Sequence, residues 1–65
     1  MTIILNGENR DIPAGTTVAA LIDMLNLSGR LAAERNGEIV PRSAHATTIL
    51  LEGDRVEIVR AIGGG

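Results

Sequence analysis

The feature that most restricts this chain is the absence of cysteine and of every aromatic residue from a sequence of only 65 residues. A chain of this length forms a single domain around a single core. Without cysteine it can build neither a disulfide framework nor a thiolate metal site, and a core of this size rarely contributes more than ~3–5 kcal/mol. The core must therefore be close-packed from Ile, Leu, Val, Ala and Met side chains.

Charge and hydropathy argue against several classes of partner. Eight acidic residues and six arginines give a formal net charge of −2, the wrong sign for sequence-independent binding to phosphate backbones. No apolar run approaches the ~20 residues of a membrane span, and the N-terminus lacks a basic segment followed by an apolar stretch. We therefore expect a cytoplasmic protein that binds neither nucleic acid nor a membrane.

Two Asn-Gly pairs predict two hairpins. Asn6-Gly7 and Asn36-Gly37 favour tight two-residue turns, because Asn and Gly readily adopt positive φ angles. The segment 31–34 is equally compatible with a helix on propensity, so its assignment as a strand competes with that alternative. The predicted strands are residues 2–5, 9–12, 31–35, 38–40 and 55 to about 61.

One helix is predicted between the two hairpins. Thr17 can cap its N-terminus, and apolar residues recur at i, i+3, i+4 and i+7 over residues 18–25. Ser28-Gly29 offers a natural end, because Gly tolerates the left-handed conformation. Residues 42–47 indicate a loop or a short turn of helix. This order of elements predicts an α+β domain with one helix laid across a small mixed sheet.

Alternation along the strands leaves aliphatic residues on the outer face of the predicted sheet. Val56 and Ile58 share the inner face of the last strand, which turns Val59 outward. The same alternation turns Ile4 outward in the first strand, so the two side chains could meet. We predict a partner-docking patch of Ile4, Val59 and Ile62, although single exposed aliphatic residues are common on any protein.

The tail Gly63-Gly64-Gly65 is the strongest functional signal. We expect a folded domain over residues 1–62 and a flexible glycine tail over 63–65, slim enough to enter a narrow tunnel because glycine has no Cβ atom. A terminal carboxylate on Gly65 is ionised at neutral pH and is a poor electrophile, so a partner has to activate it. A frayed end or an added linker is the commoner explanation of such tails. The start at Met1 without a tag, and the lack of a polar spacer, favour function here.

Other candidate sites are weak. Ser43 and His45 lie close in sequence, but a nucleophile and its base also need an orienting group and a pocket. We expect His45 to be a surface residue. Glu52 and Asp54 flank Gly53, yet acidic turn residues are usually solvated and Asp favours turns for local hydrogen bonding. We assign no catalytic residue and no metal site.

Three stretches of the chain resemble the ThiS family of sulfur carriers: Glu34–Arg42, Glu52–Val59 and Ala61–Gly65. The Asn-Gly-Glu-Ile-Val-Pro-Arg segment and the Gly-Asp turn at a fixed distance from the diglycine end carry this resemblance. Residues 3–7 and 17–21 agree with the family in position, so the likeness covers essentially the whole chain.

This resemblance implies a β-grasp, or ubiquitin-like, fold with the last strand central in the sheet. It also implies a carrier without enzymatic activity or a cofactor of its own. An adenylyltransferase related to ubiquitin-activating proteins would use ATP and magnesium to adenylate Gly65. Sulfur drawn from cysteine, as by a cysteine desulfurase, would then leave a thiocarboxylate for thiazole synthase in thiamine biosynthesis. Gly64 and Gly63 would keep the approach to Gly65 slim.

Three alternatives remain open at this point. The small subunit of molybdopterin synthase shares the fold and the diglycine end, but it usually runs longer and commonly has aromatic and proline residues before the tail. A ubiquitin-like modifier would join Gly65 to a target lysine, and the chain itself contains no lysine. A plain β-grasp interaction module would function without Gly64 and Gly65.

Overall fold

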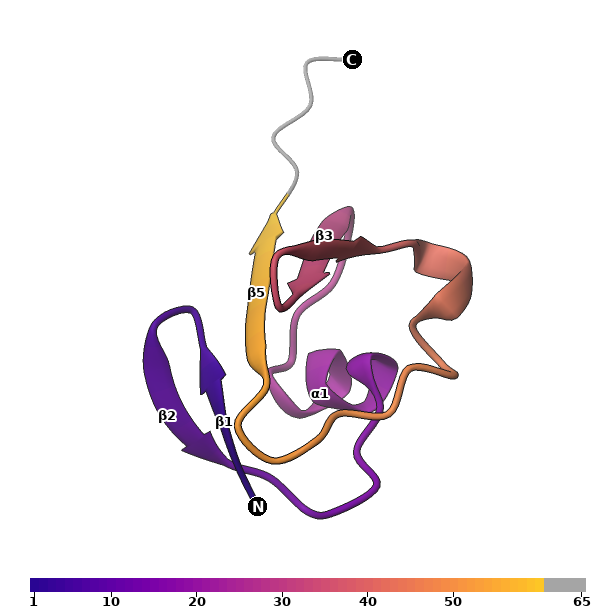
Figure 1. The fold of residues 1–65 in the computed structure, drawn as a ribbon. Coiled ribbons are helices and arrows are strands. Elements are labelled where there is room, and N and C mark those ends of the chain that lie inside the picture. Colours follow the sequence, from indigo (N-terminus) through magenta and orange to yellow (C-terminus); the bar gives the residue numbers. More distant parts are fainter. Residues whose placement is uncertain (61–65) are drawn as a thin grey trace.

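A computed structural model describes residues 1–60, which form a five-stranded mixed sheet with one α-helix packed across it (Figure 1). The elements are β1 (Thr2–Leu5), β2 (Glu8–Asp11), α1 (Val18–Met24), β3 (Leu31–Arg35), β4 (Glu38–Val40), the 3₁₀-helix η1 (Arg42–Ala44) and β5 (Arg55–Arg60). The strand order is β2-β1-β5-β3-β4, with β5 parallel to β1 and antiparallel to β3. The predicted α+β architecture is confirmed; the last two residues of the predicted domain and the predicted tail lie outside the described residues.

Both Asn-Gly hairpins are confirmed, and their backbone angles show why. Asn6 and Asn36 have φ angles of 49° and 52°, and Gly7 and Gly37 have φ angles of 84° and 85°. Positive φ at both central residues is the requirement of a type I′ turn, whose twist matches that of paired strands. The segment 31–35 is a strand rather than a helix because each of its residues pairs with β5.

The helix begins as predicted and ends earlier. The Thr17 side chain accepts a hydrogen bond from the Ala20 amide at 3.1 Å, which confirms the cap. The helix ends at Met24, whereas Ser28-Gly29 was the predicted end. Asn26 takes the left-handed conformation with a φ of 57°, so a residue other than glycine supplies the termination.

The core lies between α1 and the inner face of the sheet, and it is entirely aliphatic. Ile3, Val18 and Leu21 are fully buried, so the sheet and the helix contribute equally inaccessible side chains. The remaining buried apolar residues are Leu5, Ile12, Ala33, Val40, Leu50, Val56 and Ile58. Leu50 enters from the irregular segment before β5, where its amide donates to the Thr16 carbonyl at 2.9 Å. Neither helix of residues 1–60 is long and apolar enough to cross a membrane.

Candidate functional site

The candidate site begins with β5, because the glycines singled out above begin three positions after this strand ends in the sequence. It is the central strand and has a partner on each side: its residues pair with β3 from Val56 to Arg60 and with β1 at Arg55 and Val56. Gly63, Gly64, Gly65 and Ile62, four of the six predicted site residues, lie outside the described residues. The structure therefore shows the contacts that position β5 as far as Arg60, five residues before Gly65.

The two turn asparagines hold β5 through their side chains as well as forming the turns. The side-chain Nδ2 of Asn6 donates to the Ile58 carbonyl at 3.2 Å, and the side-chain Oδ1 of Asn6 accepts from the Ile58 backbone amide at 2.9 Å. This pair continues the β1–β5 pairing after the backbone of β1 has turned away. At the other end, the Asn36 side-chain oxygen accepts from the Arg55 amide at 2.9 Å. Each hairpin turn thus contributes to positioning the strand that precedes the glycines.

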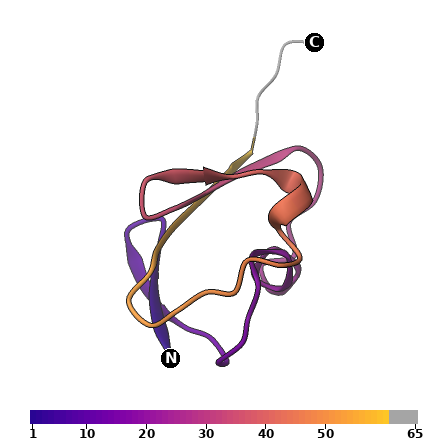
Figure 2. The same cartoon turned by 45° about the vertical axis from the view of Figure 1, so that its right-hand side comes forward.

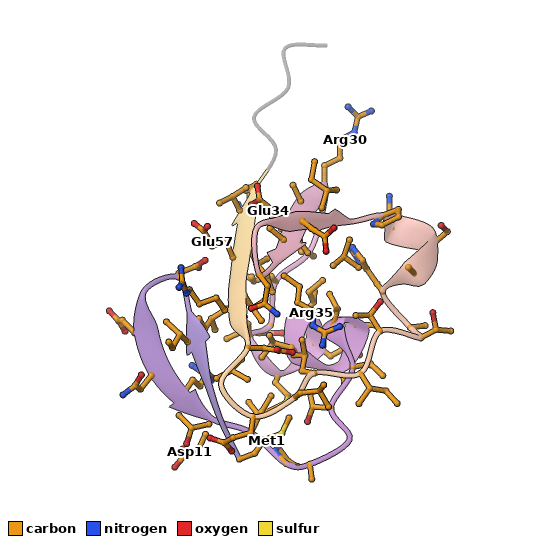
Figure 3. All side chains as sticks on the ribbon, viewed as in Figure 1. Met1, Asp11, Arg30, Glu34, Arg35 and Glu57 are labelled. Carbon is orange, nitrogen blue, oxygen red and sulfur yellow. The ribbon has the colours of Figure 1, made fainter. Side chains whose placement is uncertain are left out.

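Asp54 joins the second hairpin to the segment that precedes β5. Its carboxylate accepts hydrogen bonds from the Leu51 amide at 2.8 Å, from the Asn36 side chain at 3.1 Å and from Nε of Arg35 at 2.8 Å. Figure 3 shows Arg35 directed from β3 toward the segment that precedes β5. The expectation that this acidic turn residue is solvated was wrong, because Asp54 is 7% exposed. The neighbouring Glu52 is exposed as expected.

The environment of Asp54 favours its ionised form. Burial alone would raise the pKa of this carboxyl group. The hydrogen bonds from Leu51, Asn36 and Arg35, with the charge of Arg35, outweigh burial and hold the pKa of Asp54 below its ordinary value. The predicted local hydrogen bonding of Asp54 is confirmed by the Leu51 contact, and the cluster serves to fix β5.

The predicted docking residues share one face of the sheet but do not meet. Val59 is 55% exposed and Ile4 is half-buried, both on the face that α1 leaves uncovered. Ile4 pairs with Arg55, four positions before Val59, which corresponds to about 13 Å along the strand. Glu57 lies between them on β5, opposite Glu34 of β3 (Figure 3). Ile4 and Val59 therefore belong to opposite ends of the outer face.

One further large apolar side chain lies on this face and was not predicted to do so. Ile39 of β4 is 75% exposed and lies opposite Glu34 on the outer side of the sheet. Strand alternation across the second hairpin was the signal that could have found it, since Val40 faces the core and its neighbour must face outward.

Ser43 and His45, to which no function was assigned, lie in and just after η1. His45 is half-buried rather than fully on the surface, and its Nε2 atom lies 3.1 Å from the Val40 carbonyl oxygen. Within residues 1–60 no hydrogen bond joins Ser43 to His45, so the structure does not assemble a nucleophile and a base there. No cluster of three or more potential metal ligands occurs among the described residues.

Known proteins resemble this chain over its full length. The model of the ThiS family matches residues 3–65. The chain is 47% identical to a thiazole synthase of Paramagnetospirillum magneticum and 41% identical to one of Magnetococcus marinus, each over all of this chain but only 20% of the relative. The crystal structure of the thiamine biosynthesis protein ThiS from Geobacter metallireducens superposes with a TM-score of 0.88, at 29% identity and complete coverage of both chains.

The solved ThiS structure tests the predicted fold. The solved ThiS structure covers every element described above, so the predicted β-grasp fold with a central last strand is confirmed. The family model extends through the terminal glycines, while the chain spans only about a fifth of the curated thiazole synthases that it matches. On the match to residues 3–65 and the structural likeness, the chain belongs to the ThiS family and has its ubiquitin-like β-grasp fold.

Proposed function

We propose that this chain carries sulfur as a thiocarboxylate on Gly65 and delivers it for formation of the thiazole ring of thiamine. The observation that carries the proposal is the match to the ThiS family through residue 65, combined with a central β5 that leads into the glycines. The proposal takes Gly65 as the C-terminal residue of the working protein. Gly63 and Gly64 give access to a narrow active site because they have no side chains.

Activation has to come first, because an ionised carboxylate lacks a leaving group. An adenylyltransferase related to ubiquitin-activating proteins supplies one: a carboxylate oxygen of Gly65 attacks the α-phosphorus of ATP, pyrophosphate departs and an acyl-adenylate forms. A sulfur nucleophile then attacks the Gly65 carbonyl carbon and AMP leaves. Sulfide gives the thiocarboxylate directly, whereas a persulfide formed by a cysteine desulfurase gives an acyl disulfide, which a thiol reduces to the thiocarboxylate with formation of a disulfide. The covalent carrier divides one difficult transfer into two easier steps. The chain supplies the acyl group of Gly65 and the strand β5 that precedes it. The partner enzymes catalyse the adenylation and the sulfur transfer.

The acceptor in this proposal is a thiazole synthase, and the setting is the cytoplasm. Two curated relatives bear the name thiazole synthase, and each contains a region similar to the whole of this chain. Such covalent linkage in relatives supports a working association between the carrier fold and a synthase, because joining two binding modules raises their effective concentration.

Docking of the adenylyltransferase is proposed for the outer face near the end of β5. Val59 lies one residue before the end of β5, and its side chain is more than half exposed. An enzyme that binds the residues after β5 can therefore contact Val59 directly. Ile62 extends this proposed contact toward Gly65. Ile4, about 13 Å away along the sheet, marks the outer limit of the patch.

The test is the intact mass of the protein after incubation with ATP, magnesium, a sulfide source and the cognate adenylyltransferase. The mass before reaction establishes whether the chain ends at Gly65. We expect a gain of about 16 Da, the replacement of one carboxyl oxygen by sulfur, located at Gly65 by fragmentation. A variant lacking Gly65 serves as the control and should gain nothing. An unchanged wild-type mass, with an enzyme that modifies another carrier, would refute the proposal.

A further inference from the structure

Each hairpin turn of this chain contains an asparagine followed directly by a glycine, and this pair has a reactivity of its own. In Asn6-Gly7 and Asn36-Gly37 the glycine nitrogen can close a ring on the side-chain carbonyl carbon of the preceding asparagine. Glycine has no Cβ atom, so it hinders this closure less than any other residue. The other two asparagines, Asn9 and Asn26, precede residues with long side chains. The turn asparagines are therefore the most reactive amide side chains of the chain.

The reaction is a deamidation that needs only water. The Gly7 nitrogen loses its proton and forms a bond to Cγ of Asn6, while the bond from Cγ to Nδ2 breaks and ammonia leaves with that proton. Water then adds to one of the two carbonyl carbons of the cyclic imide and reopens it. One opening leaves aspartate, and the other leaves isoaspartate, in which the main chain runs through the former side chain. No electrons are exchanged with another group, so no redox partner is required.

The attacking nitrogens are accessible in the fold. Gly7 and Gly37 are exposed, and within residues 1–60 neither backbone N–H donates a hydrogen bond. The two turn asparagines are exposed as well, so water reaches both turns. Both turns lie beside β5 (Figure 2), where their asparagines contact Ile58 and Arg55. Accessibility therefore does not limit the reaction at either turn.

The side-chain amides, in contrast, are held by β5 and the residue before it. Nδ2 and Oδ1 of Asn6 contact the Ile58 carbonyl and amide at 3.2 Å and 2.9 Å. Nδ2 of Asn36 donates to Oδ1 of Asp54 at 3.1 Å, and Oδ1 of Asn36 accepts from the Arg55 amide at 2.9 Å. Ring closure brings Cγ to the glycine nitrogen and expels Nδ2, so it breaks both hydrogen bonds of an asparagine. The reaction therefore proceeds from a chain in which the turn has opened away from β5.

Either product prevents the opened turn from recovering its contacts. The carboxylate formed from Asn6 has no N–H group to donate to the Ile58 carbonyl. The carboxylate formed from Asn36 would lie at hydrogen-bonding distance from the buried carboxylate of Asp54, where like charges repel. Isoaspartate also adds a backbone atom to the turn, which the type I′ geometry does not accommodate.

We propose that Asn6 and Asn36 are sites of spontaneous deamidation, and that β5 controls this modification by holding their side chains. While β5 occupies its place it restrains both amides. When a turn opens, the reaction converts a reversible opening into a permanent one. Asn6 is the faster site, because its contacts are with neutral backbone groups, whereas Asn36 donates to a carboxylate and such charge-assisted hydrogen bonds are about twice as strong. The inference goes beyond the proposed function and does not depend on the chemistry of Gly65.

The first measurement follows deamidation in the whole chain, folded in neutral buffer and unfolded in guanidinium chloride at the same pH. Trypsin cleaves after arginine and separates the sites into peptides 1–10, 11–30 and 36–42, in which each event adds about 1 Da as an amide becomes a carboxyl group. In the unfolded chain we expect Asn6 and Asn36 to react at least about tenfold faster than the matched controls Asn9 and Asn26. Folding should slow Asn6 at least about tenfold and Asn36 by more, since two hydrogen bonds must open first.

The variant Asp54→Ala tests the restraint at one site. It removes the acceptor of the Asn36 side chain and leaves both contacts of Asn6 with Ile58 in place. The ratio of the Asn36 rate to the Asn6 rate should rise at least about fivefold, because a loss of global stability affects both sites alike. Circular dichroism establishes that the variant folds.

The variant Asn6→Asp tests the consequence of modification without relying on Asp54→Ala. It reproduces one product directly, and Asn9→Asp is the matched control at an exposed position of the edge strand β2. Hydrogen exchange at the Ile58 amide should accelerate at least about fivefold in Asn6→Asp and less than about twofold in Asn9→Asp.

Four results would overturn the proposal. Equal rates in the folded and unfolded chains would show that β5 does not restrain the amides. Reaction of Asn9 or Asn26 as fast as that of Asn6, or no reaction in the unfolded chain, would remove the assignment to the Asn-Gly pairs. An unchanged exchange rate of the Ile58 amide in Asn6→Asp would show that deamidation does not release β5.

Discussion

Replacement of Asp54 by alanine tests the cluster that fixes the start of β5. The substitution removes one acceptor carboxylate and with it the hydrogen bonds from Leu51, Asn36 and Arg35. A hydrogen bond to a charged group contributes about 1.5–3 kcal/mol, but these donors are partly accessible, the Arg35 side chain being 29% exposed, so water can replace part of each contact. We therefore expect Asp54→Ala to lower the free energy of unfolding by about 2–4 kcal/mol.

That loss is large for a chain of this size. At about 0.05–0.15 kcal/mol per residue, the whole domain has a stability of about 3–10 kcal/mol. Each kcal/mol shifts the melting temperature of so small a domain by about 4–8 °C, so Asp54→Ala should melt more than about 8 °C below the wild type. Far-UV circular dichroism with urea or heat is the appropriate assay, because the chain has no aromatic fluorophore.

The conservative variant Asp54→Asn separates charge from shape. An amide of the same size keeps one acceptor oxygen but directs N–H groups at donors, so we expect a loss of about 1–3 kcal/mol. Asp23→Asn is the matched control, an identical chemical change at an exposed helical position. If Asp54→Asn unfolds at the same urea concentration as Asp23→Asn, the carboxylate does not hold β5 and the reasoning is wrong.

The pH dependence of the free energy of unfolding tests the same cluster independently. Because the folded pKa of Asp54 lies below the ordinary value of 3.8, the folded state binds the proton less readily than the unfolded state does. The stabilisation is therefore fully present above the unfolded pKa and is lost as the pH falls through the folded pKa. The stability difference between wild type and Asp54→Asn should be constant near neutrality and shrink below about pH 4. A difference that grows on acidification would contradict the lowered pKa.

The remaining predictions concern the cap, the strand and the proposed carrier function. Thr17→Ala should cost about 1 kcal/mol in urea unfolding, because the helix loses its cap. Asn6→Gly keeps the positive φ but removes two side-chain contacts to Ile58, so hydrogen exchange at the Ile58 amide should accelerate and stability should fall by about 1–2 kcal/mol. Val59→Asp should weaken adenylation several-fold while changing the melting temperature by less than about 4 °C, because Val59 is 55% exposed. Removal of Gly65 should abolish thiazole formation in a reconstituted assay without unfolding the domain; retained activity would refute the carrier mechanism.

Features of the fold that depend on local backbone chemistry could be predicted from the sequence. The Asn-Gly turns require positive φ at both positions, and Thr17 has a hydroxyl at the start of an amphipathic segment, so both signals act over a few residues. The end of α1 was predicted wrongly because two residue types compete for the left-handed position. Asn26 occupies it before the chain reaches Gly29, which has a φ of 91° in the connection to β3.

Features that depend on contacts distant in sequence could not be predicted in this way. The local sequence around Asp54 predicts a solvated turn residue. In the fold the second hairpin places Arg35 and Asn36, which are 18 or more positions away in sequence, within hydrogen-bonding distance of Asp54. The separation of Ile4 from Val59 follows from the register of a parallel strand pair, which no local pattern specifies. A cavity lined by residues of α1 and η1 likewise requires these two helices to pack together first.

The two turn asparagines show how local and distant requirements select one residue type. A type I′ turn accepts Asn, Asp or Gly at its first central position. Gly would satisfy the backbone at Asn6 but offer no side chain to β5, and Asp would offer acceptors without a donor. Only Asn supplies both groups that Ile58 engages, a donor to its carbonyl and an acceptor for its amide. At Asn36 the same amide donates to Asp54 and accepts from Arg55. The residue that forms each turn is therefore also the residue that holds the strand leading to Gly65.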